Sequence, residues 1–329
     1  MTMALNLRKL VDEFLEMTVA GSFTSTGFRV RQKLFDWQPP PSGALVGRTA
    51  LVTGPTSGIG RHTATELADL GARVVLVGRD EEKLTAVRDG LQAAHGEDRF
   101  PIVVADMSSL ASVQEAVDRI LETESRLDVL VDNAGAMFHQ RELSPDGIEQ
   151  TLATLVVGPF ALTSGLLPLL RETDGARVIG VTSGGMYAQP LDLDDFQLTT
   201  GPYDGPRAYA RAKRAQVALM REWARRLSGS GTTFNVMHPG WADTPGLEQM
   251  LPGFYRAMRP MLRDLDEAAD TIVWLAADPA AAGWNGRLFL DRRPRPFDRI
   301  PSTRVSAADR RRLWDMIVGL TGGRDPLSG

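Results

Sequence analysis

The sequence TALVTGPTSGIG, at residues 49–60, joins a short β-branched run directly to a helix-period segment. Its glycines, spaced G-x-x-x-G-x-G, let the backbone turn tightly and approach a pyrophosphate on the helix N-terminal amides. The spacing differs from G-x-G-x-x-G, and the G-K-[ST] of a P-loop is missing. A structural turn would also use glycine, but the position after the first strand favours a dinucleotide site. The candidate binding residues are Gly54, Ser57, Gly58, Ile59 and Gly60.

Beyond this turn, short apolar runs alternate with helix-period segments along the chain. Continuously apolar strands between helices predict a parallel sheet that is covered on both faces. We therefore expect an α/β fold with a single doubly wound (Rossmann) parallel sheet of about seven strands. The expected strands lie at residues 49–53, 73–77, 101–105, 127–131, 178–182, 233–237 and 286–290. Residues 1–45 are expected to form an N-terminal helical extension and Pro-rich linker, and residues 46–329 the dinucleotide-binding domain with a C-terminal helical tail.

The composition excludes several classes of function. The 329 residues include no cysteine, which rules out a disulfide-stapled fold, a Cys-ligated metal centre and thiol catalysis. The four histidines are scattered along the chain, so no metal site is expected. A formal net charge of −4 argues against nucleic acid as a partner.

Two apolar stretches bear on membrane contact. Leu7, Leu10 and Phe14 share one face of an N-terminal amphipathic helix, which lacks the apolar core of a secretory signal. This helix either packs on the domain or makes a peripheral membrane contact. Residues 150–170 carry no charge, but glycines and prolines interrupt them, so we expect a buried helix rather than a membrane span. The expected localisation is cytoplasmic.

The end of the second expected strand bears on cofactor choice. An acidic residue there would bind the ribose hydroxyls of NAD, whereas Gly78 and Arg79 come first in this chain. A guanidinium suits a 2′-phosphate, and Arg61 adds positive charge nearby. We expect NADP, with NAD kept open by Asp80.

Further motifs follow the later strands in a fixed order: Asp106, Asn133-Ala134-Gly135, Ser183, Tyr209-x-x-x-Lys213 and Pro239-Gly240. With them, residues 46–290 resemble the short-chain dehydrogenase/reductases. SGGMY, HPGWADTPG and the N-terminal extension resemble one narrower group of that family. The resemblance implies an oxidoreductase that interconverts a carbonyl and an alcohol by hydride transfer from a nicotinamide.

The resemblance also implies a role for each motif. Asp106 would accept a hydrogen bond from the adenine, with Met107 beside the ring. The ribose side would be lined by Asn133, Ala134 and Gly135, and the nicotinamide by Pro239, Gly240 and Thr244. Ser183, Tyr209 and Lys213 would be catalytic, and the last two would also contact the cofactor.

The spacing of Tyr209 and Lys213 fits acid–base chemistry. Side chains four residues apart share one helix face. A free phenol has a pKa near about 10, and an adjacent ammonium would lower it toward the working range. Ser183 would steady the substrate oxygen, and Tyr209 would supply the proton. Tyr187 and Tyr203 are rival tyrosines, but neither has a lysine four residues later.

Two positions depart from the family pattern. Leu155 stands where the family usually carries an asparagine that helps to hold a proton-relay water, and leucine cannot form hydrogen bonds through its side chain. Asp132 stands where a second asparagine is common. Leu155 favours an alternative function, an NADP(H)-binding scaffold or redox sensor with little turnover. An epimerase or dehydratase on the same fold is a third interpretation.

Residues 245–263 follow the sixth strand, where this architecture places a substrate lid. Their leucines, methionines and aromatics predict a lipophilic small-molecule substrate, or else a helix pair packed on the core. The helices at 150–170 and 207–227 are elements that the family often uses to form a homodimer.

Overall fold

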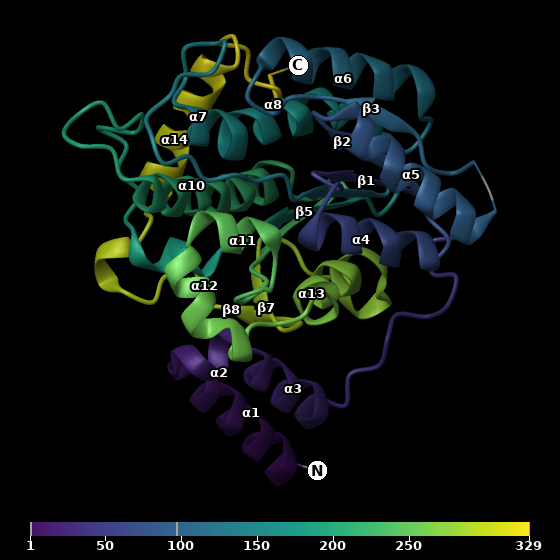
Figure 1. Cartoon of the computed structure of the whole chain (residues 1–329), viewed down its shortest axis with the longest axis vertical. Coiled ribbons are helices and arrows are strands. Elements are labelled where there is room, and N and C mark those ends of the chain that lie inside the picture. Colours follow the sequence, from purple (N-terminus) through teal and green to yellow (C-terminus); the bar gives the residue numbers. More distant parts are fainter. Residues whose placement is uncertain (1, 97, 329) are drawn as a thin grey trace.

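The central sheet has the predicted doubly wound topology. The computed structural model describes residues 2–96 and 98–328. Its strands lie in the order β3-β2-β1-β4-β5-β6-β7-β8, and β1 to β7 pair in parallel (Figure 1). Their bounds are Thr49–Thr53 (β1), Arg73–Gly78 (β2), Ile102–Val104 (β3), Val129–Asp132 (β4), Arg177–Val181 (β5), Thr233–Met237 (β6), Leu288–Leu290 (β7) and Arg293–Arg295 (β8). The order reverses between β1 and β4, which is where such sheets bind ligands.

Helices cover both faces of the sheet, as the apolar strands predict. Ala50 and Val52 pack toward one face and Leu51 toward the other, because side chains alternate along a strand. The first face is covered by α4 (Gly58–Asp69), α5 (Glu81–His95) and α13 (Leu265–Ala277). The second is covered by α6 (Leu110–Thr123), α8 (Gly158–Gly165) and α10 (Gly205–Arg226). The predicted fold class is confirmed.

The eighth strand, β8, was not predicted. It pairs antiparallel with β7 through a two-residue turn in which Asp291 and Arg292 have φ values of 55° and 53°. Such left-handed pairs suit a tight hairpin. The strand itself reads Arg-Pro-Arg, which has neither β-branched residues nor apolar alternation, so its sequence gives no strand signal.

The uncharged segment at residues 150–170 is buried, as expected, but it is not one regular helix. It comprises α7 (Gln150–Leu152), a π-helical turn (Ala153–Val157), α8 and the start of α9 (Leu167–Glu172). Pro159 lacks an N–H and its ring opposes the carbonyl of Leu155, which accounts for the widened turn before it. Gly158 allows a close approach, since a Cβ there would lie 2.0 Å from the Met107 carbonyl oxygen.

The C-terminal helix α14 (Ala307–Leu320) packs across α10. Its fully buried Trp314 lies edge-on to Trp223 of α10, with ring centroids 4.5 Å apart, and to Phe160 of α8 at 5.0 Å. Part of the face that a homodimer was expected to use is therefore covered within the chain. The homodimer stays a prediction.

The first helix of the N-terminal extension packs on the sheet edge through charged residues. The extension forms α1 (Thr2–Met17), α2 (Val19–Phe23) and α3 (Ser25–Phe35) at the lower end of the molecule (Figure 1). The buried Asp12 accepts hydrogen bonds from Arg31 at 2.7 Å and from Arg295 of β8 at 2.9 Å. Arg31 also donates to Asp291 at 2.8 Å, so the β7–β8 turn and the extension share one buried ion network.

As a consequence, the apolar face of α1 points outward. The exposed fractions of Leu7, Leu10, Phe14 and Met17 are 62%, 63%, 66% and 84%. The expected helix exists and packs on the domain, through Asp12 and Glu16, which face the arginines, rather than through its apolar face. Within the described residues, every helix is too short or too polar to cross a bilayer.

Candidate active site

The turn between β1 and α4 has the geometry that its glycines predict. Gly54 and Gly58 have φ values of 68° and 51°. A Cβ at Gly60 would lie 2.2 Å from the Gly54 carbonyl oxygen, so only glycine fits there. Ser57 precedes α4 and, as far as the described residues show, its side chain makes no capping hydrogen bond. The first-turn amides, including that of Ile59, are therefore suited to a pyrophosphate.

The Asn133-Ala134-Gly135 segment lies directly against this turn. Asn133 donates from Nδ2 to the carbonyl oxygens of Thr53 at 2.9 Å and Gly54 at 3.2 Å. The Ala134 amide donates to Thr53 Oγ1 at 3.0 Å. Asn133 thus fixes the turn after β1 to the end of β4.

At the end of β2, Asp80 is held by Lys83, whereas Arg79 has no hydrogen bond or ion pair with any residue that the structure describes. Asp80 caps α5 by accepting from the Lys83 amide at 3.1 Å, and it pairs with the Lys83 ammonium at 2.8 Å. Arg79 is exposed, and so is Arg61 at the start of α4. This arrangement presents guanidinium rather than carboxylate at the sheet edge where a ribose would lie.

The side chains of Asp106 and Met107, which follow β3, make contacts that stabilise the fold. Asp106 Oδ1 accepts hydrogen bonds from the Ser108 amide at 2.9 Å and from its hydroxyl at 2.8 Å. Met107 is buried in the core beneath α8. Their adenine contacts stay predictions.

Ser183, Tyr209 and Lys213 converge at the end of β5. Ser183 follows β5, and its side chain lies beside the partly buried Tyr209. The Lys213 ammonium lies 5.7 Å from the centre of the Tyr209 ring. It donates to the Val181 carbonyl oxygen at 2.7 Å and to Gln216 Oε1 at 3.3 Å. An ammonium has three N–H donors, so one remains for a cofactor hydroxyl.

Burial dominates the electrostatics of this group. Burial raises the pKa of Tyr209 to about 12, and the neighbouring Ser183 hydroxyl opposes this. Burial also lowers the pKa of Lys213 to about 8, against the opposing charge of Asp132. The expected lowering of the pKa of Tyr209 is therefore absent in this structure, because desolvation of the phenol raises the pKa and the Lys213 ammonium does not contribute to the shift. Tyr209 is held as a proton donor at neutral pH.

The residues after β6 lie on the other side of the site. Pro239 is buried, and Thr244 caps the first lid helix by accepting from the Leu247 amide at 3.1 Å. A Cβ at Gly58 would lie 3.3 Å from Thr244, so this loop approaches the glycine turn directly. The predicted lid forms α11 (Pro245–Met250) and α12 (Pro252–Met258). Phe254 packs edge-on to Trp241, with ring centroids 4.9 Å apart.

Phe23 is a residue beside the site that sequence reasoning missed. Its backbone carbonyl accepts from the Trp241 amide at 2.8 Å, and its ring stacks on Trp241 at 5.4 Å. A Cβ at Gly184, next to Ser183, would lie 2.3 Å from the Phe23 ring. The extension therefore supports the loops after β5 and β6. Nothing in a lone phenylalanine, over 150 residues from either loop, signals this contact.

The rival tyrosines are engaged elsewhere. Tyr187 donates to the Pro296 carbonyl oxygen at 2.9 Å, and Tyr203 donates to Glu149 at 2.8 Å. Among the described residues, His62, Glu66 and Asp266 are near enough to hold a metal ion, but His62 pairs with Asp266 at 2.8 Å. The expected absence of a metal stays a prediction.

Comparisons with known proteins show the family to which the chain belongs. The short chain dehydrogenase family profile matches residues 48–252. Human dehydrogenase/reductase SDR family member 12 is 41% identical over 251 residues, covering 76% of this chain and 78% of the relative. Human retinol dehydrogenase 13 is 33% identical over 230 residues, covering 70% of each.

Solved structures show the same fold. The Pseudomonas aeruginosa RhlG/NADP active-site complex has a TM-score of 0.62 at 28% identity, covering 75% of this chain and 96% of that chain. The short chain dehydrogenase from Shigella flexneri has a TM-score of 0.63 at 26% identity, covering 78% and 95%. The chain belongs to the short-chain dehydrogenase/reductase family of oxidoreductases, and within it the chain resembles dehydrogenase/reductase SDR family member 12.

Proposed function

We propose that this chain is an NADP(H)-dependent oxidoreductase that interconverts a lipophilic carbonyl compound and its alcohol, with Tyr209 as the general acid and base. The observation that carries this proposal is the convergence of Ser183, Tyr209 and Lys213 beside the glycine turn. NADP(H), when bound, supplies or accepts the hydride. Ser183 then orients the substrate oxygen, Tyr209 moves the proton to or from it, and Lys213 holds the cofactor ribose.

The substrate class is inferred from the lid. Leu247, Met250, Leu251 and Phe254 are only half-buried, and they lie on α11, on α12 and on the residue between these helices. Methionine and leucine adapt to irregular apolar ligands, which supports a lipophilic substrate. The name of one relative, retinol dehydrogenase 13, refers to a lipophilic alcohol. A screen of carbonyls of graded hydrophobicity tests this part, and turnover of small polar ketones alone would contradict it.

Cofactor preference is tested at Arg79. Replacing Arg79 by alanine should raise the Kd for NADPH by about 10-fold to 100-fold, because a charge-assisted hydrogen bond contributes about 1.5–3 kcal/mol. The Kd for NADH should change by less than about threefold. Fluorescence titration of both cofactors measures this. Arg88→Ala is the matched control. It removes an arginine of α5 that pairs with its neighbour Asp89. Equal weakening of NADPH and NADH by Arg79→Ala would contradict the assignment.

Leu155 favours a second function, an NADP(H)-binding scaffold or redox sensor. Its side chain is fully buried. Because it is a hydrocarbon, it supplies no hydrogen bond beside the catalytic lysine. This function predicts cofactor binding without Tyr209-dependent turnover in the same carbonyl screen.

We also propose that α1 makes a peripheral membrane contact. Leu7, Leu10, Phe14 and Met17 form an exposed apolar stripe, and the exposed Arg8 and Lys9 flank it, which suits anionic headgroups. The chain should co-sediment with anionic phospholipid vesicles, and L10S/F14S should lower the partition coefficient by at least about tenfold. Leu143→Ser, at an exposed leucine away from this stripe, is the control. Equal sedimentation of all three proteins would contradict the contact. Cytoplasmic localisation stays a prediction.

A further inference from the structure

A buried arginine, Arg263, lies against residues 239–244, the segment that follows β6. Arg263 pairs with this segment through its backbone, since its amide donates to the Trp241 carbonyl oxygen at 2.7 Å and its carbonyl oxygen accepts from the Asp243 amide at 2.8 Å. The side chain of Arg263 is only 1% exposed. A charged group that is enclosed in this way needs partners, and its partners show what it holds in place.

The guanidinium group of Arg263 occupies the space that a side chain at position 240 would need. A Cβ at Gly240 would lie 2.4 Å from Arg263 Nε and 2.7 Å from the carbonyl oxygen of Phe23. Gly240 also has a φ of 75°, which residues with a side chain rarely adopt. Packing and backbone conformation therefore both require the glycine of the Pro239-Gly240 motif, and the Gly240 backbone is held against Arg263 and Phe23.

Arg263 is itself fixed by two parts of the chain that are distant in sequence. Its Nη1 and Nη2 donate to the two carboxylate oxygens of Asp291, in the β7–β8 turn, at 2.6 Å and 3.0 Å. Nη2 also donates to the carbonyl oxygen of Ser22, in α2, at 2.9 Å. The planar guanidinium suits this two-pronged pairing, which a lysine ammonium cannot reproduce.

The N-terminal extension thus reaches the segment after β6 by two routes. The carbonyl oxygen of Phe23 accepts directly from the Trp241 amide at 2.8 Å, and that of Ser22 acts through Arg263. At its other end, the segment approaches the glycine turn, because a Cβ at Gly58 would lie 3.3 Å from Thr244. The chemistry proposed above assigns no role to Arg263 or Ser22.

We propose that Arg263 is a positioning residue for the nicotinamide end of the cofactor, and that its contacts with Asp291 and Ser22 make the N-terminal extension part of the cofactor site. The inference rests on the proposed function, in which residues 239–244 lie beside the nicotinamide. Arg263 acts through the Gly240 backbone. The adenosine end would be held by other residues, among them Arg79 after β2. Loss of the Arg263 contacts should therefore weaken the binding of one end of the cofactor only.

The test compares two ligands, NADPH and adenosine 2′,5′-bisphosphate, which has the adenosine end but no nicotinamide. Arg263→Lys keeps the charge and loses the two-pronged pairing with Asp291. It should raise the Kd for NADPH by about 10-fold and the Kd for the bisphosphate by less than about threefold. Single-turnover hydride transfer should slow by about 10²-fold, the usual effect of a displacement of about 1 Å at the reacting atoms. Calorimetric titration and stopped-flow absorbance measure these effects.

Two further variants make the result specific. Asp291→Asn removes the charge that pairs with Arg263 at similar side-chain volume, so it should give the same selective loss of NADPH binding and decides the matter if Arg263→Lys does not fold. Arg295→Lys is the matched control, because Arg295 is 5% exposed and belongs to the same ion network. Arg31 and Arg293 still pair with Asp12 in this control. Arg295→Lys should lower the unfolding midpoint and keep both Kd values within about threefold.

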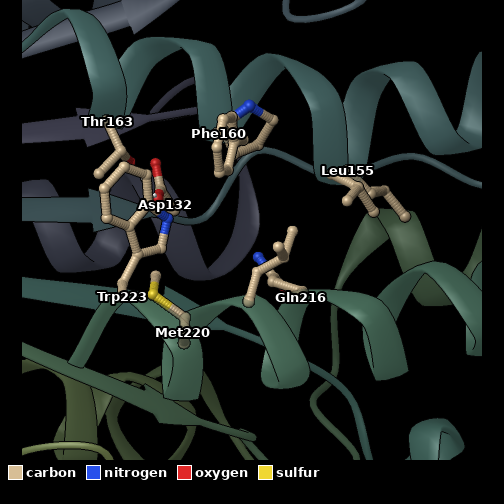
Figure 2. A pocket seen from close by; sticks show the side chains of 10 residues that line it. Asp132, Leu155, Phe160, Thr163, Gln216, Met220 and Trp223 are labelled. Carbon is tan, nitrogen blue, oxygen red and sulfur yellow. Dashed lines mark hydrogen bonds between the residues drawn. The ribbon is translucent and has the colours of Figure 1, made fainter. Parts of the chain in front are cut away.

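A second control lies in a different part of the core. Met220 lines a small pocket of about 20 Å³, together with Asp132, Leu155 and Gln216 (Figure 2). The residues that line this pocket belong to β4, the π-helical turn, α8 and α10, and none of them to the segment after β6 or to the extension. Met220→Leu roughly conserves volume and should leave both Kd values and hydride transfer unchanged. It separates the effect of Arg263 from that of a general change in the core.

The possible failures can be told apart. Equal weakening of both ligands in Arg263→Lys and Asp291→Asn would contradict the inference, because it would show a general loss of structure. Unchanged NADPH binding and hydride transfer in the folded variants would also contradict it, even with a lower unfolding midpoint. A wild type that turns over no carbonyl contradicts the proposed function, whereas the ratio of the two Kd values still tests Arg263.

Discussion

Replacing Tyr209 by phenylalanine should lower kcat for carbonyl reduction by about 10²-fold to 10⁴-fold, the usual contribution of a positioned acid. Burial raises the pKa of Tyr209 to about 12, so at neutral pH the wild-type phenol carries the proton that reduction consumes. Phenylalanine keeps the ring but has no proton to give. The Kd for NADPH should change by at most about tenfold, because at most one hydrogen bond, about 0.5–1.5 kcal/mol, is lost. Stopped-flow hydride transfer and fluorescence titration measure the two effects.

The raised pKa of Tyr209 also determines whether the rate of alcohol oxidation rises or falls with pH. Alcohol oxidation needs the phenolate as base, so its wild-type rate should rise with pH between about 7 and 9, and the rise should be absent in Tyr209→Phe. Tyr203→Phe is the matched control, since that hydroxyl donates to Glu149, away from Lys213. Full activity of Tyr209→Phe would remove Tyr209 from the chemistry. NADPH binding by a wild type that turns over no carbonyl would favour the scaffold.

The sheet and the glycine turn were predictable because their signals are local. A strand such as residues 49–53 is apolar throughout, and the turn after it needs the positive φ that glycine allows. Ser109 caps the helix after β3 by accepting from the Ser112 amide, three residues along the chain. Tyr209 and Lys213 are four residues apart on one helix, so their spacing alone places them on the same face. Each of these features depends on residues within one turn or one strand of each other.

The remaining features depend on contacts between distant residues. The polar strand β8 is held by pairing with β7 and by Asp291, whose partners are Arg31 and Arg263. The apolar periodicity of α1 predicts an inward apolar face, yet buried arginines attract its acidic face instead. The effect of burial on the pKa of Tyr209 also depends on how the whole domain packs. None of these contacts leaves a periodic signal in the sequence.

Replacing Asp12 by alanine should destabilise the fold by up to about 3–5 kcal/mol, because two buried arginines lose a counter-charge that Glu16 and Asp291 replace only in part. The side chains of Arg31 and Arg295 are only 0% and 5% exposed, and both pair with Asp12. Burial raises the pKa of Asp12, but its hydrogen bonds with Arg295 and Arg31 outweigh this and hold the pKa below its usual value. The stabilisation is therefore present above about pH 4 and is lost as the pH falls through the lowered folded-state pKa. Denaturant unfolding at neutral and acid pH measures both the loss and its sign.

Glu13 provides the control on the same helix. It is exposed and pairs only with Lys9, at 3.7 Å, among the described residues, so Glu13→Ala should change stability by less than about 0.5 kcal/mol. Asp12→Ala should also lower kcat, because the extension that Asp12 anchors carries Phe23 against the loops beside Ser183 and Trp241. Equal unfolding midpoints for the two variants would show that the ion network does not hold the extension. Loss of stability with unchanged kcat would show that Phe23 supports those loops without help from α1.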